Sequence, residues 1–418
     1  MRILLATDSF PPLCGGSGWS TYELARGLRS RGHVVLVVQP RPGRRGTHEK
    51  LVDEFRVLEF GADAPPIPYV RNYFKNEKLF ADLANYLTDL IARERIDIVH
   101  GQHVMTSVPA VRAARQSSIP SVCTIRDYWP VCYWSDLIHT ADGLALCPEC
   151  SAAMMTRCVR PHARALWPLS LPMIPYMRAN LIRKQRGLAD ADAIIAVSST
   201  IAADLRTRSS EIAAVRVEII PNAVDVAALR DRAAASTPPI DGPYALYLGK
   251  LAPNKGTTNL VQVVERSGLD WPVIIAGDGP ERAAIAAAAA RSARDIRFVG
   301  WVDQPAATAW LAHASMLLFP SRGPESLSRV LLEASALGVP IAAMNTGGTV
   351  DIILDERTGL LSRNFEELAD DIRRLRDDAG LRRQLGAAAR AHAETHFDTS
   401  VVLPRVEQLY HDVLRRQA

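Results

Sequence analysis

The chain has 418 residues, of which 48% are hydrophobic and 22% are charged, and its formal net charge is +4 at pH 7. This composition excludes a disordered chain and is typical of a globular enzyme, and the length favours two domains over one. The net charge is small for this length, and the sequence has no finger, RNP or basic-zipper pattern. Nucleic-acid binding is therefore not expected.

The first stretch, MRILLATDSFPP, is typical of a first β-strand rather than a signal peptide. Its apolar run is short, two prolines follow it, and it has no small-residue cleavage site. The chain has no run of about eighteen apolar residues, so an ordinary membrane span is not expected. We expect a cytoplasmic protein, and we therefore expect its six cysteines to be thiols or metal ligands rather than disulfides.

Strand-like runs alternate with helical patterns in the first half of the chain, which predicts a parallel, doubly wound sheet. These runs cover residues 2–7, 33–39, 96–102, 121–125, 193–198 and 217–221. A second series follows at residues 244–249, 272–277, 296–300, 316–321 and 340–345. The sequence therefore predicts an α/β protein with two Rossmann-like domains.

Turn-forming residues mark the boundary between the two series, at Pro221–Asp225 and at Pro238-Pro239. We place the N-terminal domain at residues 1–224 and the second domain at residues 225–397. Residues 398–418 have the periodicity of a terminal helix, and we expect this helix to pack back on the first domain.

A glycine-rich loop follows the first strand and contains Gly15 and Gly16. Glycines at this place let backbone N–H groups approach an anionic ligand at a helix N-terminus, although a tight turn also explains them. An NAD site is disfavoured, because the G-x-G-x-x-G spacing is absent and strand two ends in Gln39-Pro40 where a ribose-binding acid is expected.

A cysteine-rich insert is predicted within the first domain at residues 131–160. Four cysteines in under thirty residues suit a structural zinc ion or an iron–sulfur cluster, and ordinary thiols are the alternative because the spacing is irregular. They are Cys132, Cys147, Cys150 and Cys158.

A basic segment follows at residues 157–186, with seven Arg or Lys, no acidic residue and the apolar centre LWPLSLPMIPYM. It suits peripheral contact with an anionic membrane surface, or else a surface loop partly buried against its domain.

Charged side chains follow the strands of the second series. Lys250 and Lys255 come after its first strand, at the carboxyl end where open α/β sheets bind ligands, and two lysines can neutralise a diphosphate without a metal. Glu325 and Glu333 come after its fourth strand. If the chain is helical from Ser328, the two carboxylates lie about 10 Å apart and suit two ends of one elongated ligand.

In their order and spacing these motifs resemble the retaining GT-B glycosyltransferases of glycosyltransferase family 4, which transfer sugars from nucleotide donors. The resemblance covers nearly the whole chain and implies two doubly wound domains facing across a cleft. It rests on the glycine loop and on the motifs Pro221–Asp225, Gly249–Gly256, Gly277–Pro280, Glu325–Glu333, Gly338–Pro340 and Gly347-Gly348.

The resemblance assigns Glu325 to hydroxyls of the donor sugar, Glu333 to the ribose, and Lys250 and Lys255 to the diphosphate. Chemistry of this type retains the anomeric configuration, requires no cofactor or protein nucleophile, and lets the leaving phosphate oxygen take the acceptor's proton. Further donor contacts are implied at Gly15, Gly16, Trp301, Val302, Asp303, Ser328 and Arg329.

The sequence departs from the family pattern at three places. Lys250 stands where an arginine is common, and Ser326-Leu327-Ser328 replace a usual Phe-Gly. Arg126 stands before Asp127 where many members have a histidine that contacts the donor sugar. We treat Arg126, Asp127 and the strand-end residue His103 as candidate sugar or acceptor contacts, although His103 also suits a plain structural role.

The sequence thus predicts a glycosyltransferase that acts on a glycan or lipid-linked acceptor in polysaccharide or glycoconjugate biosynthesis, in the cytoplasm or at the inner face of the membrane. The alternatives are a nucleotide-sugar epimerase of the same architecture, and a non-catalytic nucleotide-sugar binder or metal-stapled scaffold.

Overall fold

The computed structural model describes residues 1–417 except 13, 66, 68–69, 139–145 and 164–166. The chain divides into two compact units. The first contains residues 1–136, 148–223 and the C-terminal segment from Val402. The second contains residues 224–401, together with the described residues 137, 138, 146 and 147 of the cysteine-rich insert.

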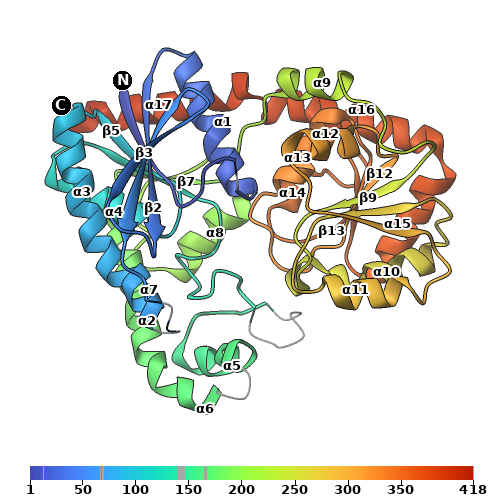
Figure 1. The fold of residues 1–418 in the computed structure, drawn as a ribbon, viewed down its shortest axis with the longest axis horizontal. Coiled ribbons are helices and arrows are strands. Elements are labelled where there is room, and N and C mark those ends of the chain that lie inside the picture. Colours follow the sequence, from blue (N-terminus) through green and yellow to red (C-terminus); the bar gives the residue numbers. More distant parts are fainter. Residues whose placement is uncertain (13, 66, 68–69, 139–145, 164–166, 418) are drawn as a thin grey trace. The chain divides into compact units, whose positions relative to one another are not determined.

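An eight-stranded sheet forms the centre of the first unit, in the order β3-β4-β2-β1-β5-β6-β7-β8 (Figure 1). All its neighbouring strands are parallel except the edge pair β3 and β4. The strands are β1 (Arg2–Ala6), β2 (Val34–Pro42), β3 (Thr47–Val52), β4 (Phe55–Ala62), β5 (Ile98–Gly101), β6 (Ser121–Ile125), β7 (Ala193–Ala196) and β8 (Val217–Ile219).

Helices surround this sheet, as a doubly wound topology requires. They are α1 (Gly16–Ser30), α2 (Val70–Tyr73), α3 (Leu79–Glu94), α4 (Ser107–Gln116), α5 (Ala152–Ala163), α6 (Trp167–Ser170), α7 (Ile174–Ala189), α8 (Ser199–Arg208) and α17 (Thr399–Gln417). A π-helical turn (Phe74–Lys78) precedes α3, and a 3₁₀ turn (Leu171–Met173) precedes α7.

The two faces of β1 show how the sequence builds a core on each side of the sheet. Side chains alternate along a strand, so Ile3 and Leu5 face one side and Leu4 faces the other. Ile3 and Leu5 belong to a cluster with buried residues of α1 and α17, whereas Leu4 belongs to a cluster with buried residues of α3 and α4. Both faces are apolar because both are covered by helices.

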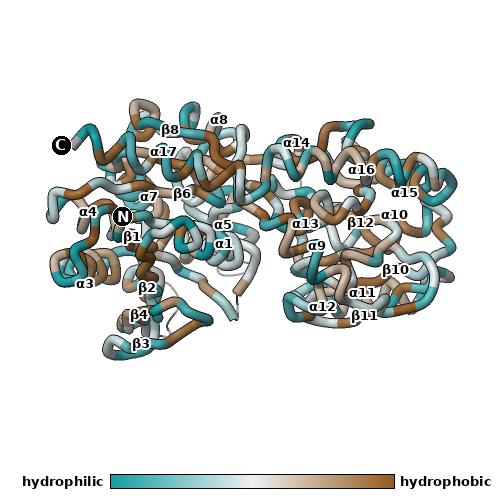
Figure 2. Tube along the Cα trace, turned by 90° about the horizontal axis from the view of Figure 1, so that it is seen from above, coloured by the Kyte–Doolittle hydropathy of each residue, from teal (hydrophilic) through white to brown (hydrophobic). Residues whose placement is uncertain are grey.

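The second unit has a six-stranded, wholly parallel sheet in the order β11-β10-β9-β12-β13-β14. Figure 2 shows the hydrophobic stretches that run through β10 and β12. The strands are β9 (Ala245–Leu248), β10 (Val273–Ala276), β11 (Ile296–Gly300), β12 (Met316–Phe319), β13 (Ile341–Met344) and β14 (Leu360–Ser362).

Helices cover both faces of the six-stranded sheet (Figure 1). They are α9 (Val226–Ala234), α10 (Thr257–Ser267), α11 (Arg282–Ala289), α12 (Gln304–Ala312), α13 (Arg329–Leu337), α14 (Thr349–Ile352), α15 (Phe365–Asp377) and α16 (Ala379–His396). A 3₁₀ turn (Pro253–Lys255) precedes α10.

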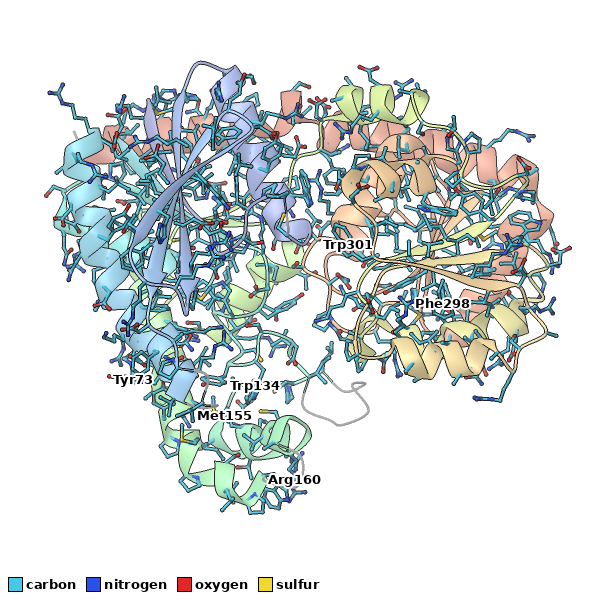
Figure 3. All side chains as sticks on the ribbon, viewed as in Figure 1. Tyr73, Trp134, Met155, Arg160, Phe298 and Trp301 are labelled. Carbon is cyan, nitrogen blue, oxygen red and sulfur yellow. The ribbon has the colours of Figure 1, made fainter. Side chains whose placement is uncertain are left out.

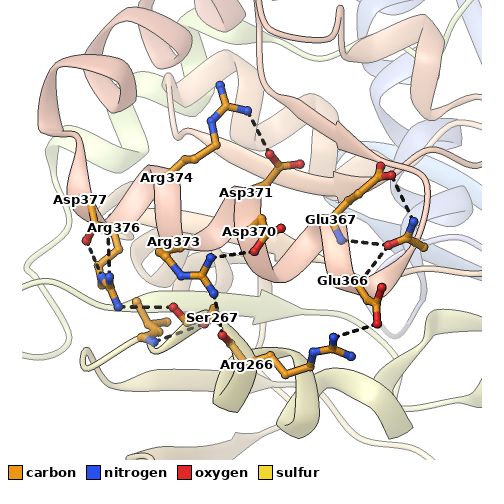
Figure 4. A network of polar contacts seen from close by, with 12 residues as sticks. Arg266, Ser267, Glu366, Glu367, Asp370, Asp371, Arg373, Arg374, Arg376 and Asp377 are labelled. Atoms are coloured by element: carbon orange, nitrogen blue, oxygen red, sulfur yellow. Dashed lines mark hydrogen bonds and ion pairs between the residues drawn. The ribbon is translucent and has the colours of Figure 1, made fainter.

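Polar contacts tie α10 to α15 at the surface of this unit (Figure 4). Arg266 pairs with Glu366 at 2.8 Å, and Arg373 donates to the Arg266 carbonyl at 2.9 Å. Arg376 donates to the Gly268 carbonyl at 2.6 Å, just beyond the end of α10. The Arg266–Glu366 ion pair is exposed and therefore contributes little to stability.

The predicted fold class is confirmed, since both units are doubly wound α/β folds built on parallel sheets. Three strands were not predicted, namely β3, β4 and β14. Residues 47–52 of the antiparallel edge strand β3 are polar and mostly exposed and lack a strand-like pattern. No helix within the described ranges is long and apolar enough to cross a membrane.

Candidate functional site

The two loops that carry Lys255 and Glu325 lie together in the second unit. Lys255 follows β9 and Glu325 follows β12, and these strands are neighbours in the sheet, so their carboxyl ends meet at one edge. Lys255 Nζ lies 2.6 Å from Glu325 Oε1. The hydroxyl of Ser321 also donates to Glu325 Oε1. The structure therefore brings together two residues that the sequence places seventy positions apart.

Two glycines make this contact possible. Gly256 has φ +65°, and a Cβ there would lie 1.9 Å from the Pro320 carbonyl oxygen. Gly347 has φ +52°, and a Cβ there would lie 2.1 Å from the Glu325 carbonyl oxygen, which also accepts a 2.6 Å hydrogen bond from the backbone N–H of Gly348. Only glycine permits these approaches, so both positions hold the Glu325 loop in place.

Glu333 lies one turn into α13, which begins at Arg329 with Ser328 as its N-cap. The helix considered in the sequence analysis therefore begins one residue after Ser328. Glu333 is buried, and its Oε1 accepts hydrogen bonds from Arg329 Nε at 2.8 Å and from Gln304 Nε2 at 3.3 Å. Arg329 and Glu333 are four residues apart on one helix face, which suits an ion pair. The predicted residue Arg329 thus holds a second predicted residue in position.

The remaining predicted donor residues of the second unit differ in their exposure and in their hydrogen-bond contacts. Trp301 follows β11 and is 62% exposed (Figure 3), with Val302 beside it. Asp303 caps α12, because its Oδ1 accepts from the Ala306 N–H at 3.0 Å. Lys250 is exposed, and its backbone carbonyl accepts from Tyr247 OH at 2.8 Å.

The glycine loop of the first unit leads directly into α1. Gly15 is the N-cap of α1 and Gly16 is its first residue, and no side chain caps this end. Nothing lies within 4 Å of where a Cβ at Gly15 would stand, so packing does not require glycine there. The uncapped N–H groups of a fifteen-residue helix are consistent with the predicted anion contact, which stays a prediction.

Arg126 lies just after β6 and is buried among neutral partners. Its Nε donates to Asn222 Oδ1 at 2.9 Å, and its NH1 contacts Gln102 Oε1. Burial lowers the pKa of Arg126 to about 9, because the charged form is desolvated, so the guanidinium stays charged near pH 7. Arg126 thus has a bonding pattern unlike that of the paired charges in the second unit.

His103 lies after β5 at the same edge. Its Nδ1 lies 3.0 Å from the Thr7 hydroxyl, and its Nε2 is buried without a partner among the described residues. Burial, and secondarily the Arg126 charge, lowers the pKa of His103 to about 3, so the imidazole is neutral at working pH. His103 is therefore a hydrogen-bonding group rather than a cation.

Two carboxyls and one ammonium also gather in the first unit. Burial raises the pKa of Asp8 to about 7 and that of Asp127 to about 6, against lowering hydrogen bonds from Met105 N–H and Trp129 N–H respectively. Burial lowers the pKa of Lys184 to about 8, and the charge of Lys184 acts on both carboxyls. Strongly perturbed groups at one sheet edge are typical of a functional site.

Sequence reasoning missed Asp8, Gln102, Lys184 and Ser321. For Asp8, Gln102 and Ser321 a signal was present, because Asp8 directly follows a predicted strand, as Lys250 does, and Gln102 and Ser321 each end one. Lys184 lies in the middle of α7, and nothing in its local sequence distinguishes it from a surface lysine.

The cysteine-rich insert is only partly within the described residues, since residues 139–145 fall outside them. Cys150 and Cys158 lie in an apolar cluster with Met155 and Trp134, which Figure 3 labels. Cys132 Sγ lies 3.9 Å from Asp136 Oδ1. Within the described ranges no three His, Cys, Asp or Glu side chains are grouped so that they could hold a metal ion. A metal that also draws on the rest of the insert stays a prediction.

The basic segment forms α5, α6 and α7, with residues 164–166 outside the described part. The Arg160 guanidinium lies 4.4 Å from the centre of the Trp167 ring, and Leu169 is 76% exposed. Membrane contact by this segment stays a prediction.

Residues 14–228 match the family described as Glycosyltransferase Family 4, and residues 242–378 match glycosyl transferases group 1. The chain belongs to Glycosyltransferase Family 4. Membership of this family explains the order of motifs from the glycine loop to Glu333, as the sequence predicted. The protein is a glycosyltransferase of this family.

One of the curated relatives is similar over nearly the whole chain, and another over about half of it. The family 4 chain is 25% identical to a glycogen synthase of Mycobacterium tuberculosis, over 98% of this chain and 94% of that protein. It is 30% identical to a phosphatidyl-myo-inositol mannosyltransferase of Propionibacterium freudenreichii, over 54% of this chain and 57% of that protein.

Solved structures share the fold at lower identity. Anabaena Alr3699/HepE in complex with UDP-glucose has a TM-score of 0.65 and 17% identity, covering 99% of this chain and 100% of that one. Sucrose-phosphate synthase from Thermosynechococcus elongatus has a TM-score of 0.67 and 19% identity, covering all of both chains. The GT-B fold of this family 4 glycosyltransferase is thereby confirmed.

Proposed function

We propose that the protein transfers a sugar from a nucleotide-sugar donor to a glycan or lipid-linked acceptor, with retention of the anomeric configuration. The observation that carries this proposal is the 2.6 Å contact between Lys255 Nζ and Glu325 Oε1 at the carboxyl edge of the second sheet. A cation for the diphosphate and a carboxylate for the sugar hydroxyls stand side by side there. These are the two groups that flank the bond that breaks.

The donor runs along this edge in the proposed complex. Glu325 accepts hydrogen bonds from the sugar hydroxyls, Lys255 and Lys250 neutralise the diphosphate, and Glu333 binds the ribose. Glu333 is already held by Arg329 and Gln304, so its carboxylate is oriented before the ligand arrives. Oriented charges lower the barrier because they need no rearrangement during the reaction.

The chemical step needs no protein nucleophile. The bond from the anomeric carbon to the phosphate oxygen breaks, and the acceptor hydroxyl attacks from the same face. The leaving phosphate oxygen takes the hydroxyl proton, so charge and atoms balance without a metal. Lys255 and Lys250 stabilise the negative charge that develops on the diphosphate.

Similar proteins support the substrate classes. Solved structures of Anabaena Alr3699/HepE contain UDP, and others contain UDP with glucose or UDP-glucose. Among the curated relatives are a glycogen synthase and a phosphatidyl-myo-inositol mannosyltransferase, whose names point to a glycan and a lipid-linked acceptor. Uridine diphosphate sugars are therefore the first donors to test.

The test begins with a thermal-shift screen of the full chain against UDP, GDP, ADP and TDP sugars, because a ligand at about one hundred times its Kd stabilises by nearly 3 kcal/mol. The donor that stabilises is then incubated with glycan and lipid-linked acceptors, and the anomeric configuration of the product is read by NMR. Inverted product disproves retention. Donor that changes configuration at a ring carbon without any acceptor identifies an epimerase instead.

A further inference from the structure

A buried cation at the carboxyl end of β6 has no role in the proposed reaction. Arg126 is 9% exposed, and its guanidinium contacts the neutral amides of Asn222 and Gln102. No carboxylate among the described residues forms an ion pair with it. A buried charge without an opposite charge is unfavourable, so an arginine in this setting is expected to receive an anion from elsewhere.

The titratable groups that face Arg126 do not supply that charge. They are His100, His103 and Tyr410. Burial lowers the pKa values of both histidines and raises that of Tyr410, so all three are neutral near pH 7. His100 is also occupied on both sides, since its ring nitrogens lie 2.6 Å from Tyr410 OH and 2.7 Å from the Thr124 hydroxyl.

Gln102 presents an unused donor beside the guanidinium. A guanidinium has only N–H donors, so Gln102 must turn its Oε1 toward Arg126. Its Nε2 then points elsewhere, and it is buried with no hydrogen-bond partner among the described residues. A fully buried amide N–H₂ without an acceptor is costly, which indicates that a ligand atom accepts there.

His103 presents an unused donor at the same edge. The backbone N–H of Asp8 donates to His103 Nδ1 at 3.4 Å, so Nδ1 is an acceptor, and the Thr7 hydroxyl lies 3.0 Å from it. In this tautomer the buried Nε2 carries the proton, and no described residue accepts from it. A ligand oxygen would complete it.

The space on the α1 and α17 side of Arg126 does not hold the missing anion. A cavity of about 20 Å³ lies there, lined by Arg126, Asn222 and His100 among others. It has room for a single water molecule, and a neutral water would leave the charge of the guanidinium uncompensated. A carboxylate does not fit in it, so the anion must approach from the ligand side of the sheet.

We propose that the sugar bound at this edge carries a carboxylate, as a uronic acid does, and that Arg126 is its counter-charge. The carboxylate accepts hydrogen bonds from Arg126 and Gln102 Nε2, and an oxygen of the same sugar accepts from His103 Nε2–H. One carboxylate matches one guanidinium, whereas a phosphate dianion would bring a second negative charge toward Asp8 and Asp127. The inference rests on the proposed function and specifies its substrate class.

The test compares matched sugars in two arms with the full chain. In the donor arm, calorimetry gives the Kd of UDP-glucuronate and of UDP-glucose. In the acceptor arm, NMR titration in the presence of UDP gives the Kd of methyl glucuronide and of methyl glucoside. We expect the carboxylate-bearing sugar to bind roughly 30-fold more tightly in one arm, which identifies whether the donor or the acceptor carries it.

Substitutions then assign the preference to the guanidinium. Arg126→His replaces the guanidinium by an imidazole that burial keeps neutral, and we expect it to cut the preference below about threefold. Arg126→Lys keeps the charge and should keep most of the preference. Arg112→His, at an exposed position on α4, is the matched control and should not change it.

Each outcome decides one question. Equal binding of charged and neutral sugars in both arms overturns the inference, and so does a preference that survives Arg126→His. If Arg126→His does not fold, the wild-type comparison still decides. A protein that prefers the uronic acid but transfers no sugar in any combination refutes the proposed function and leaves the inference standing. Sugar transfer without a preference for the uronic acid supports the proposed function and refutes the inference.

Discussion

The ligand edges of the two sheets hold charge in different ways. In the second unit each buried carboxylate has a cation, since Glu325 meets Lys255 at 2.6 Å and Glu333 meets Arg329 at 2.8 Å. In the first unit Arg126 meets only neutral amides, and burial raises the pKa of Asp8 to about 7. The buried carboxylates at the second unit's edge are paired with cations before a ligand binds, whereas Arg126 at the first unit's edge has no ion-pair partner among the described residues.

This difference predicts opposite responses to substitution. Removing one partner of a buried ion pair leaves the other charge unpaired, so changes in the second unit should cost both activity and stability. Removing an uncompensated charge relieves a cost that the folded state already bears. Changes in the first unit should therefore cost ligand recognition while they raise stability.

The largest effect is expected for Lys255→Ala. The substitution removes a charge that matters most as the diphosphate leaves, and it leaves Glu325 without its cation. We expect kcat/KM to fall by a factor of roughly 30 to 1,000, which corresponds to a loss of about 2 to 4 kcal/mol of transition-state stabilisation. Steady-state kinetics with the donor found by the thermal-shift screen measure it.

Lys250→Arg is the control for this prediction, because it keeps a charge at the exposed neighbouring position and should retain activity. An unchanged kcat/KM in Lys255→Ala would refute the assignment of Lys255 to the diphosphate.

The second prediction separates the two glutamates. Glu325→Gln should lower kcat by a factor on the order of one hundred, because the sugar ring gains positive charge as the bond breaks and the carboxylate then matters more. Binding of free UDP, measured by calorimetry, should barely change. Glu333→Gln should mainly raise the donor KM, since ribose contacts are equal in the ground and transition states.

The opposite result would reverse the direction of the donor. If Glu325→Gln weakens free UDP while Glu333→Gln leaves UDP binding intact, the sugar lies against α13 and the nucleotide against the loop after β12.

The third prediction concerns stability in the first unit. The folded-state pKa of Asp8 is raised from 3.8 to about 7, so between these pH values the folded protein keeps a proton that the unfolded chain has lost. Stability from this group is therefore highest near pH 4 and falls as the pH rises to about 7. Asp8→Asn should flatten this slope and raise the free energy of unfolding at pH 8 by about 1 to 2 kcal/mol.

Denaturant unfolding between pH 5 and 8 measures the slope. Asp63→Asn is the control, because Asp63 is exposed and pairs with Arg45 at 3.6 Å at the surface, and its slope should equal that of the wild type. An unchanged slope in Asp8→Asn would show that Asp8 is ionised in the folded protein over this pH range.

The sequence located the clustered charged residues of the second unit better than those of the first. Lys255, Glu325 and Glu333 follow strand-like runs, and the rule that ligands bind at the carboxyl ends of parallel strands locates such residues. The same rule locates Asp8, which directly follows the first strand-like run. Both sheets were predictable because their central strands are continuous apolar runs.

Contacts between distant residues were not predictable. The Lys255–Glu325 pair depends on the neighbouring positions of β9 and β12, and the setting of Arg126 depends on Asn222, ninety-six residues away. A local pattern shows that an arginine is present, but it does not show whether a carboxylate or an amide will face it. Burial and partner identity are tertiary properties, and these decide the pKa values and the charge balance of the site.

The smallest effect is expected for Ser321→Ala. The Ser321 hydroxyl is buried, donates to Glu325 Oε1, and lies 3.2 Å from the Asn254 carbonyl. Because Lys255 still holds the carboxylate, we expect kcat to fall only by roughly five- to tenfold, with little change in the donor KM. Ser326→Ala, at a neighbouring serine in the same loop, should leave both constants unchanged.

A double-mutant cycle shows whether Ser321 acts through Glu325. If Ser321 only orients the Glu325 carboxylate, adding Ser321→Ala to Glu325→Gln should lower kcat by less than about twofold, because the group that it positions is already lost. If the two effects multiply, Ser321 contributes by a route other than Glu325. Its contact with the Asn254 carbonyl would then help to hold the site, in addition to the Lys255–Glu325 ion pair.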